Sequence, residues 1–188
     1  MPDRTLAWIG ILLQNVKEWL LSLRRICDMP VKSPISLRED LVQAGFAESK
    51  FGFLGCTEDE ITSLERKMQI SLPSAYKDFL RAFGKESGDF LSDCTHLYAD
   101  LPAGVRRSAL AKAERSGFEL EPRWFVFLSR DDIFFYFDTS MGEDPPVWRY
   151  DESCNRFEQV FPSYSQWLNT VVSDEVQGMI RIKRMRQK

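Results

Sequence analysis

The sequence has little of what metal centres and disulfide scaffolds require. It contains one histidine and four cysteines in 188 residues, and Cys27, Cys56, Cys94 and Cys154 form no CxxC pair. Structural zinc sites use closely spaced Cys and His ligands, and disulfide-rich domains use dense cysteine spacing. Cys94 with His96 supplies only two ligands. We therefore expect no metal site and no cofactor, and reduced thiols in a cytoplasmic protein.

The motifs of common enzyme classes are also missing. There is no Gly-rich phosphate loop, no HExxH, and no nucleophile with a base in a corroborating motif. Asp131 and Asp132 could act as the paired carboxylates of a hydrolase. However, adjacent residues of a strand point to opposite faces unless a turn bends them together. We expect that the protein is not an enzyme.

No apolar run is long enough to cross a bilayer, which takes about 20 residues. In the stretch "LAWIGILLQNVKEWLLSLRRI", Gln14, Asn15, Lys17 and Glu18 interrupt the apolar residues, and no signal-peptide cleavage site follows. The spacing predicts an amphipathic helix, which could pack on its own domain, form a homodimer or lie in a membrane interface. Its apolar stripe consists of Leu6, Ile9, Leu13, Val16, Leu20, Leu23 and Cys27.

Basic residues are scarce outside the last part of the chain. The net charge is −3, but the last eight residues, "RIKRMRQK", hold five Lys and Arg, and the rest has 20 basic against 28 acidic residues, or −8. An acidic body disfavours specific nucleic-acid binding and favours a basic partner, although it can also serve solubility alone. We expect a disordered tail that could hold phosphate or anionic lipid weakly.

Helix signals are present in the first half of the chain, after a linker near Pro30. A short helix is expected from Ser36 onward. Thr57 and Glu60 then have the spacing of a capping box, in which each residue binds the backbone amide of the other. In the next helix, Pro73 suits the first helical position, and Gly84 suits the left-handed residue that ends a helix.

The second half of the chain is rich in strand signals. "WFVFL" and "IFFYFD" flank "SRDD", and "VWRY" and "RFEQVF" flank "DESCN", which predicts two antiparallel hairpins. A basic helix over about 104–115 precedes them, and a packed helix follows Pro162. This order predicts an α+β fold with an antiparallel meander sheet covered by helices on one face, plus the N-terminal amphipathic helix. The expected domains are a helix and linker at 1–30, the α+β domain at 31–175, and a basic tail at 176–188.

Three phrases occur in a fixed order along the α+β part. They are "G-x-T-x-x-E-I-x-x-L-E" at Gly55 to Glu65, "LPxxYxxFL" at Leu72 to Leu80, and "PVWRYDE…F…WL" ending at Leu168. Together they resemble the SUKH superfamily, which includes the yeast Smi/Knr cell-wall regulators and many bacterial immunity proteins. The resemblance covers about residues 36–173.

The resemblance implies an α+β binding domain without catalytic machinery. Bacterial relatives look like immunity proteins, each of which binds a cognate toxin, often a nuclease, and blocks it. Our first hypothesis is therefore occlusion of a toxin, with a basic toxin domain as the partner. The eukaryotic relatives imply the alternative, a regulatory adaptor of the cell-wall or signalling type that acts through protein or membrane-surface contacts.

The candidate contacts lie in the loops between the predicted strands and on one strand. Acidic loop residues could steer the protein toward a basic cleft, and buried aromatic side chains could hold the complex. Each acidic residue could equally serve its own turn, and the aromatic ones could belong to the sheet. The candidates are Asp131, Asp132, Asp138, Glu143, Asp144, Trp148, Tyr150, Asp151 and Glu152.

Overall fold

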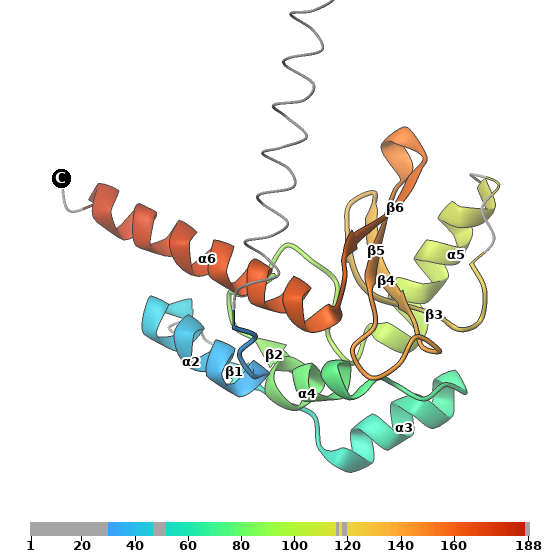
Figure 1. Cartoon of the computed structure of the whole chain (residues 1–188), viewed down its shortest axis with the longest axis horizontal. Helices are drawn as coiled ribbons and strands as arrows, with labels where there is room; N and C mark the ends of the chain where they lie inside the picture. Colours follow the sequence, from blue (N-terminus) through green and yellow to red (C-terminus); the bar gives the residue numbers. More distant parts are fainter. Residues whose placement is uncertain (1–29, 47–51, 116, 118–119, 187–188) are drawn as a thin grey trace, which may run out of the picture. The chain divides into compact units, whose positions relative to one another are not determined.

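The computed structural model describes residues 30–46, 52–115, 117 and 120–186, so the expected N-terminal amphipathic helix lies outside it. The described residues form an α+β fold, which confirms the predicted class (Figure 1). The elements are α2 (Pro34–Ala44), β1 (Phe53–Leu54), α3 (Glu58–Met68), α4 (Ser74–Phe83), β2 (Glu86–Ser87), the π-helical turn η2 (Leu101–Val105), α5 (Arg106–Arg115), β3 (Trp124–Arg130), β4 (Ile133–Asp138), β5 (Val147–Asp151), the 3-10 turn η3 (Glu152–Cys154), β6 (Arg156–Phe161) and α6 (Tyr164–Arg186).

The main sheet is an antiparallel meander in the order β3-β4-β5-β6. Both predicted hairpins are present, and their strands are held in register by large side chains. Phe125 pairs with Phe137 across the first hairpin, and Tyr150 pairs with Phe157 across the second. Cross-strand aromatic pairs of this kind stabilise a sheet by about 0.2–1 kcal/mol each. A second, two-stranded sheet joins β1 and β2.

The larger part of the core lies between one face of the sheet and the helices α4 and α6 (Figure 1). Tyr76 of α4 is fully buried at its centre. Its ring lies 5.2 Å from that of Phe125, 5.4 Å from that of Phe137, and 5.4 Å from that of Tyr164 at the start of α6. The apolar stripes predicted for the two helices therefore meet each other and the sheet.

A second, smaller core covers part of the opposite face of the sheet, so the expectation of one covered face is wrong. Ala109 and Ala113 of α5 are buried against this face, together with Val126 and Phe134 of the strands. The small alanine side chains let the helix approach the sheet closely. The run "IFFYF" carries apolar residues on both faces of β4, which is typical of a strand buried on both sides.

The predicted helix ends can be compared with the structure at α3 and α4. The capping box of α3 is confirmed, because the Thr57 amide donates to Glu60 Oε2 at 2.8 Å and the Glu60 amide donates to Thr57 Oγ1 at 3.3 Å. Both predicted ends of α4 differ from the structure. Pro73 lies one residue earlier than expected, in the cap position of α4. Gly84 is not left-handed, with a φ of −61°. A Cβ there would lie 2.6 Å from Cys56 Sγ, so close packing explains the glycine.

Helix α6 continues through most of the segment for which we expected disorder. It runs without interruption to Arg186 and packs beside α2 along part of its length. Val176 and Met179 still pack against the main core. The expectation of a disordered tail is therefore wrong for residues 176–186.

Candidate functional site

The acidic candidate contact residues lie at two opposite ends of the main sheet. Antiparallel strands reverse direction at each connection, so the β3–β4 and β5–β6 turns share one end and the β4–β5 loop lies at the other. We call these the turn end and the loop end. The turn end contains Asp131, Asp132, Asp151 and Glu152, and the loop end contains Asp138, Glu143 and Asp144.

The two turns of the turn end are tied together by Lys112 of α5. Its ammonium lies 2.5 Å from Asp132 Oδ1 and 2.8 Å from Glu152 Oε2, and it stands over the Phe134 ring at 5.3 Å. Lys112 holds the pKa of the Asp132 carboxyl below its usual value, and the two carboxylates raise the pKa of Lys112. Because its side chain is only 17 % exposed, Lys112 is a structural link rather than a surface charge.

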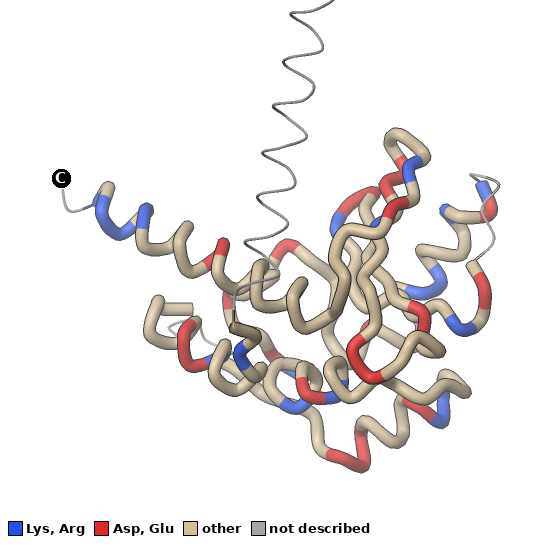
Figure 2. The backbone as a smooth tube through the Cα atoms, viewed as in Figure 1, with Lys and Arg blue, Asp and Glu red and all other residues tan. Residues whose placement is uncertain are grey.

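The other two carboxylates of the turn end pair with no cation in the part of the chain that the structure describes. Asp131 is exposed at a positive φ of 49° in the β3–β4 turn. Asp151 accepts hydrogen bonds from the Ser153 hydroxyl and amide, which lower its pKa and cap η3. Arg115 is the second cation that pairs here, at 3.5 Å from Glu152. The four carboxylates thus outnumber the two cations of α5 that pair with them, while Arg130 and Arg156 beside the turns pair with Asp93 and Glu158 instead. Figure 2 shows acidic and basic segments close together at this end of the sheet.

At the loop end, two of the predicted contacts cap helices instead. Glu143 Oε2 accepts a hydrogen bond from the Ser74 amide at 2.8 Å, at the start of α4, and this bond lowers the pKa of Glu143. Asp144 Oδ1 accepts one from the Ser165 amide at 2.8 Å, at the start of α6. A carboxylate stabilises a helix N-terminus by binding its unpaired amides.

The third acidic residue of the loop end, Asp138, is also structural. It is 6 % exposed and accepts hydrogen bonds from the Ser140 amide at 2.8 Å and the Ser140 hydroxyl at 2.6 Å. Arg123 pairs with its second oxygen at 3.1 Å. The local turn interpretation therefore holds for Asp138.

The two aromatic candidates lie on the α5 side of the sheet. Tyr150 is 4 % exposed, and its hydroxyl donates to Asn155 Oδ1 at 3.1 Å, so it is not available to a partner. Trp148 is half-buried and stacks on Phe157 with ring centres 5.0 Å apart. Trp124 packs edge-on against it at 5.9 Å. Trp124, Trp148 and Phe157 form a half-buried aromatic patch on this face.

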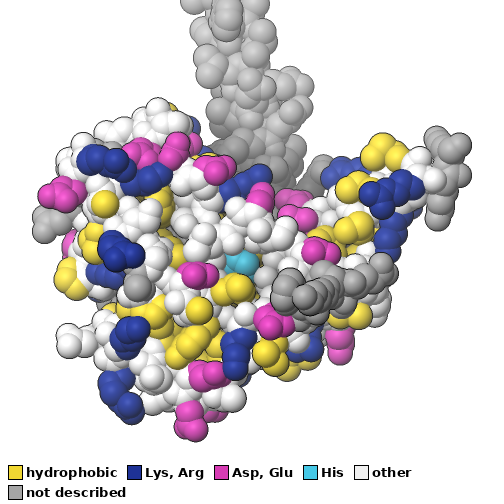
Figure 3. Space-filling view, turned by 180° about the vertical axis from the view of Figure 1, so that it is seen from behind, with side chains coloured by type: hydrophobic (Ala, Val, Ile, Leu, Met, Phe, Trp, Pro, Cys, Tyr) yellow, Lys and Arg dark blue, Asp and Glu magenta, His cyan; other side chains and the backbone are white. Residues whose placement is uncertain are grey.

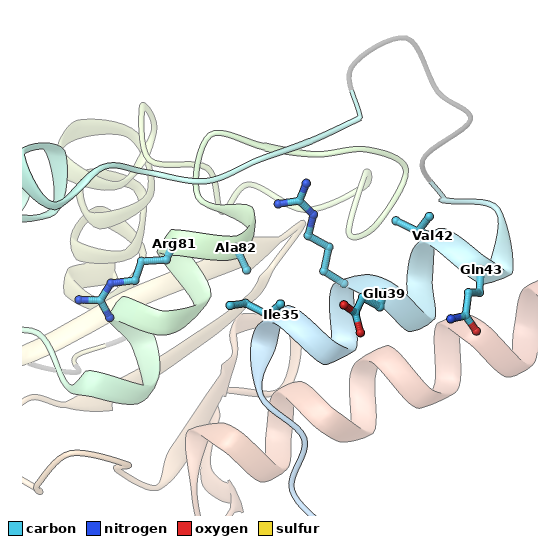
Figure 4. Close-up of a pocket in the computed structure, with 7 residues that line it drawn as sticks. Ile35, Glu39, Val42, Gln43, Arg81 and Ala82 are labelled. Carbon is cyan, nitrogen blue, oxygen red and sulfur yellow. The ribbon is translucent and has the colours of Figure 1, made fainter.

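The structure also contains a groove that the sequence analysis missed. It has a volume of about 520 Å³, is open to solvent, and lies between α2 and α4 (Figure 4). Arg81 on one wall is already paired with Glu58 and Asp78. Ile35 and Val42 on the other wall are 66 % and 47 % exposed. No local sequence signal marks the groove, because its walls come from helices that are far apart in the chain.

Among the described residues, the three thiols and the histidine do not combine into a reactive site. His96 is buried and contacts Ser87 Oγ at 3.0 Å, and burial lowers its pKa. Burial also raises the pKa of Cys56 to about 11 and that of Cys94 to about 12. Within the described ranges, no three His, Cys, Asp or Glu side chains are grouped to hold a metal ion.

None of the helices described is both long and apolar enough to span a bilayer.

Comparison with known proteins gives one family match. A family model described as "SMI1 / KNR4 family (SUKH-1)" matches residues 55–170. The match begins just before the Thr57 cap and ends in the second turn of α6, so it contains α3, α4, the main sheet and α5. No curated protein matches the chain.

Proposed function

Because the chain belongs to the SMI1/KNR4 family (SUKH-1), we propose that it is a non-catalytic immunity protein that binds a cognate toxin and neutralises it by occlusion. The observation that carries this proposal is the group of four carboxylates at the turn end of the sheet, two of which, Asp131 and Asp151, pair with no cation among the described residues. Its partner would be a basic toxin domain, such as a nuclease whose active-site cleft carries Lys and Arg. The toxin would then be blocked because its cleft is covered, with no chemical step by this chain.

The geometry of the turn end supports tight binding in two ways. Lys112 fixes the β3–β4 turn against the β5–β6 turn, so little conformational freedom is lost when a partner binds. The carboxylates of Asp131 and Asp151, which no cation of the described residues neutralises, would contact the partner's cations. The acidic body, at −8 without the last eight residues, would speed the encounter by long-range attraction.

The aromatic patch provides a further surface on the same side as α5. Phe157 pairs with Tyr150, the residue next to Asp151, so the patch begins one strand position from the turn end. Aromatic side chains at the centre of an interface commonly carry a large share of the binding energy. We propose that the toxin contacts the turn end first and the patch second.

The test is co-expression with a toxin candidate encoded in the neighbouring reading frame. We expect survival of the host cells and inhibition of the purified toxin by the wild-type chain. The variant Asp131→Asn/Asp151→Asn should bind measurably more weakly, by up to about 30-fold, because each exposed ion pair contributes roughly 1 kcal/mol or less. Asparagine at position 151 can still cap η3, so the fold should be retained.

A matched control removes two exposed carboxylates that do not belong to the turn end. Asp59→Asn/Asp89→Asn changes the net charge by the same amount and should leave toxin binding nearly unchanged. If wild type and vector give equal survival with a confirmed toxin, the immunity proposal is refuted. If the control weakens binding as much as the turn-end variant, the proposed contact surface is wrong.

A further inference from the structure

The last turns of α6 extend beyond the part of the helix that packs on the core. Met179 is the last residue of α6 that contacts the main core, and every residue from Arg181 to Arg186 is exposed. The exposed last turns can remain helical because the earlier turns of α6 are packed on the core. They extend a helix that has already formed, so the unfavourable step of helix nucleation is not repeated. The fold therefore presents a short, exposed helical surface.

This surface combines cations with exposed apolar side chains. Ile182 is 41 % exposed and Met185 is 69 % exposed, and a spacing of three places them on the same side of the helix. The cations around them are Arg181, Lys183, Arg184 and Arg186. None of these four pairs with a carboxylate in the part of the chain that is described. Figure 2 shows that basic residues gather along this end of α6, and Figure 3 shows basic and hydrophobic side chains next to each other there.

We propose that this end of α6 is a binding site for anionic lipid headgroups at a membrane surface. Cations on such a segment attract anionic lipids, while Ile182 and Met185 can enter the boundary between headgroups and acyl chains. A nucleic acid or free phosphate would use the cations but gain nothing from two exposed apolar side chains. The pairing of both features therefore favours a lipid surface. This proposal does not depend on the toxin proposal.

The acidic charge of the body does not prevent this contact. The helix rises about 15 Å from Val176 to Arg186, at about 1.5 Å per residue. At physiological ionic strength, charges separated by more than about 8 Å in water are largely screened from each other. A membrane at the end of α6 would therefore interact mainly with its cations and only weakly with the acidic sheet.

The experiment uses the full chain and two kinds of vesicle, one of phosphatidylcholine alone and one with about a quarter phosphatidylglycerol. Flotation should recover the protein only with the anionic vesicles, and less of it as salt is raised. In Arg181→Gln/Arg184→Gln, the partition coefficient should fall about 30-fold, which corresponds to about 1 kcal/mol for each charge removed. In Ile182→Ser/Met185→Ser it should fall at least about fivefold, because apolar contact is lost.

The matched control is Arg66→Gln/Lys67→Gln, which removes two exposed cations from the last turn of α3. It should leave vesicle binding unchanged, and circular dichroism should show equal helix content in all variants. Binding that is equal for both kinds of vesicle, or that is lowered as much by the control, would overturn the proposal. So would normal binding by Ile182→Ser/Met185→Ser, which would indicate a purely ionic contact with some other anion.

Discussion

Substituting Gly55 by alanine should strongly destabilise the fold, for a steric reason. A Cβ at this position would lie 1.6 Å from the carbonyl oxygen of Arg81 and 2.4 Å from its carbonyl carbon. Both atoms belong to the backbone of α4, so no side-chain rotation can remove the overlap. The φ of Gly55 lies outside the left-handed region, and conformational strain is therefore not the cause.

The loss of stability can be estimated from the backbone movement that the added methyl group requires. To accept a methyl group, the segment before α3 has to separate from the end of α4 by more than an ångström. This separation breaks the hydrogen bond from the Cys56 amide to the Leu80 carbonyl, which is 2.8 Å long and contributes about 1 kcal/mol. Disturbed packing around Cys56 and Phe83 adds about 1–3 kcal/mol. The total, about 2–4 kcal/mol, is a large part of the 5–15 kcal/mol that stabilises a typical domain.

The assay is urea unfolding followed by tryptophan fluorescence. With an m-value of about 2 kcal/mol/M, the midpoint of Gly55→Ala should fall by about 1–2 M. The control is Gly178→Ala in α6, where a Cβ would meet nothing within 4 Å. Alanine is the better helix former by about 1 kcal/mol, so this variant should be slightly more stable. The reasoning is refuted if Gly55→Ala unfolds within about 0.5 kcal/mol of wild type, or if the control loses as much stability.

Three further predictions concern caps, pH and thiols. Asp144→Ala should lower the free energy of unfolding by about 1 kcal/mol and Asp144→Asn by much less, as measured in urea, because only alanine removes the oxygen that accepts from the Ser165 amide at the start of α6. The pKa of Asp132 is lower in the folded state, so its contribution is present above its unfolded pKa of about 4 and is lost as pH falls further. Lys112→Met should therefore lose more stability at pH 7 than at pH 3, and an equal loss at both would contradict this assignment. Mass spectrometry should find that a thiol reagent labels exposed Cys154 in the native protein, whereas Cys56, buried with a pKa of about 11, is labelled only on unfolding.

Features that depend on neighbouring residues were predictable from the sequence. The capping box of Thr57 and Glu60 and the two hairpins are present as expected, because their interactions span only a few residues. The order of helices and strands then indicated the α+β class, and the phrases from Gly55 to Leu168 indicated the family that the comparison identified. Local patterns were sufficient wherever the stabilising contacts are themselves local.

Tertiary structure alone decided which acidic residues are available to a partner. Glu143 binds the amide of Ser74, which is 69 residues away in the sequence, so a residue that resembled a contact is a helix cap. Gly84 resembled a left-handed terminator, but the proximity of Cys56 requires a glycine there. The last turns of α6 are helical because the helix is docked beside α2. In each case the deciding partner comes from a distant part of the chain, and no periodicity or local spacing can reveal such a contact before the chain folds.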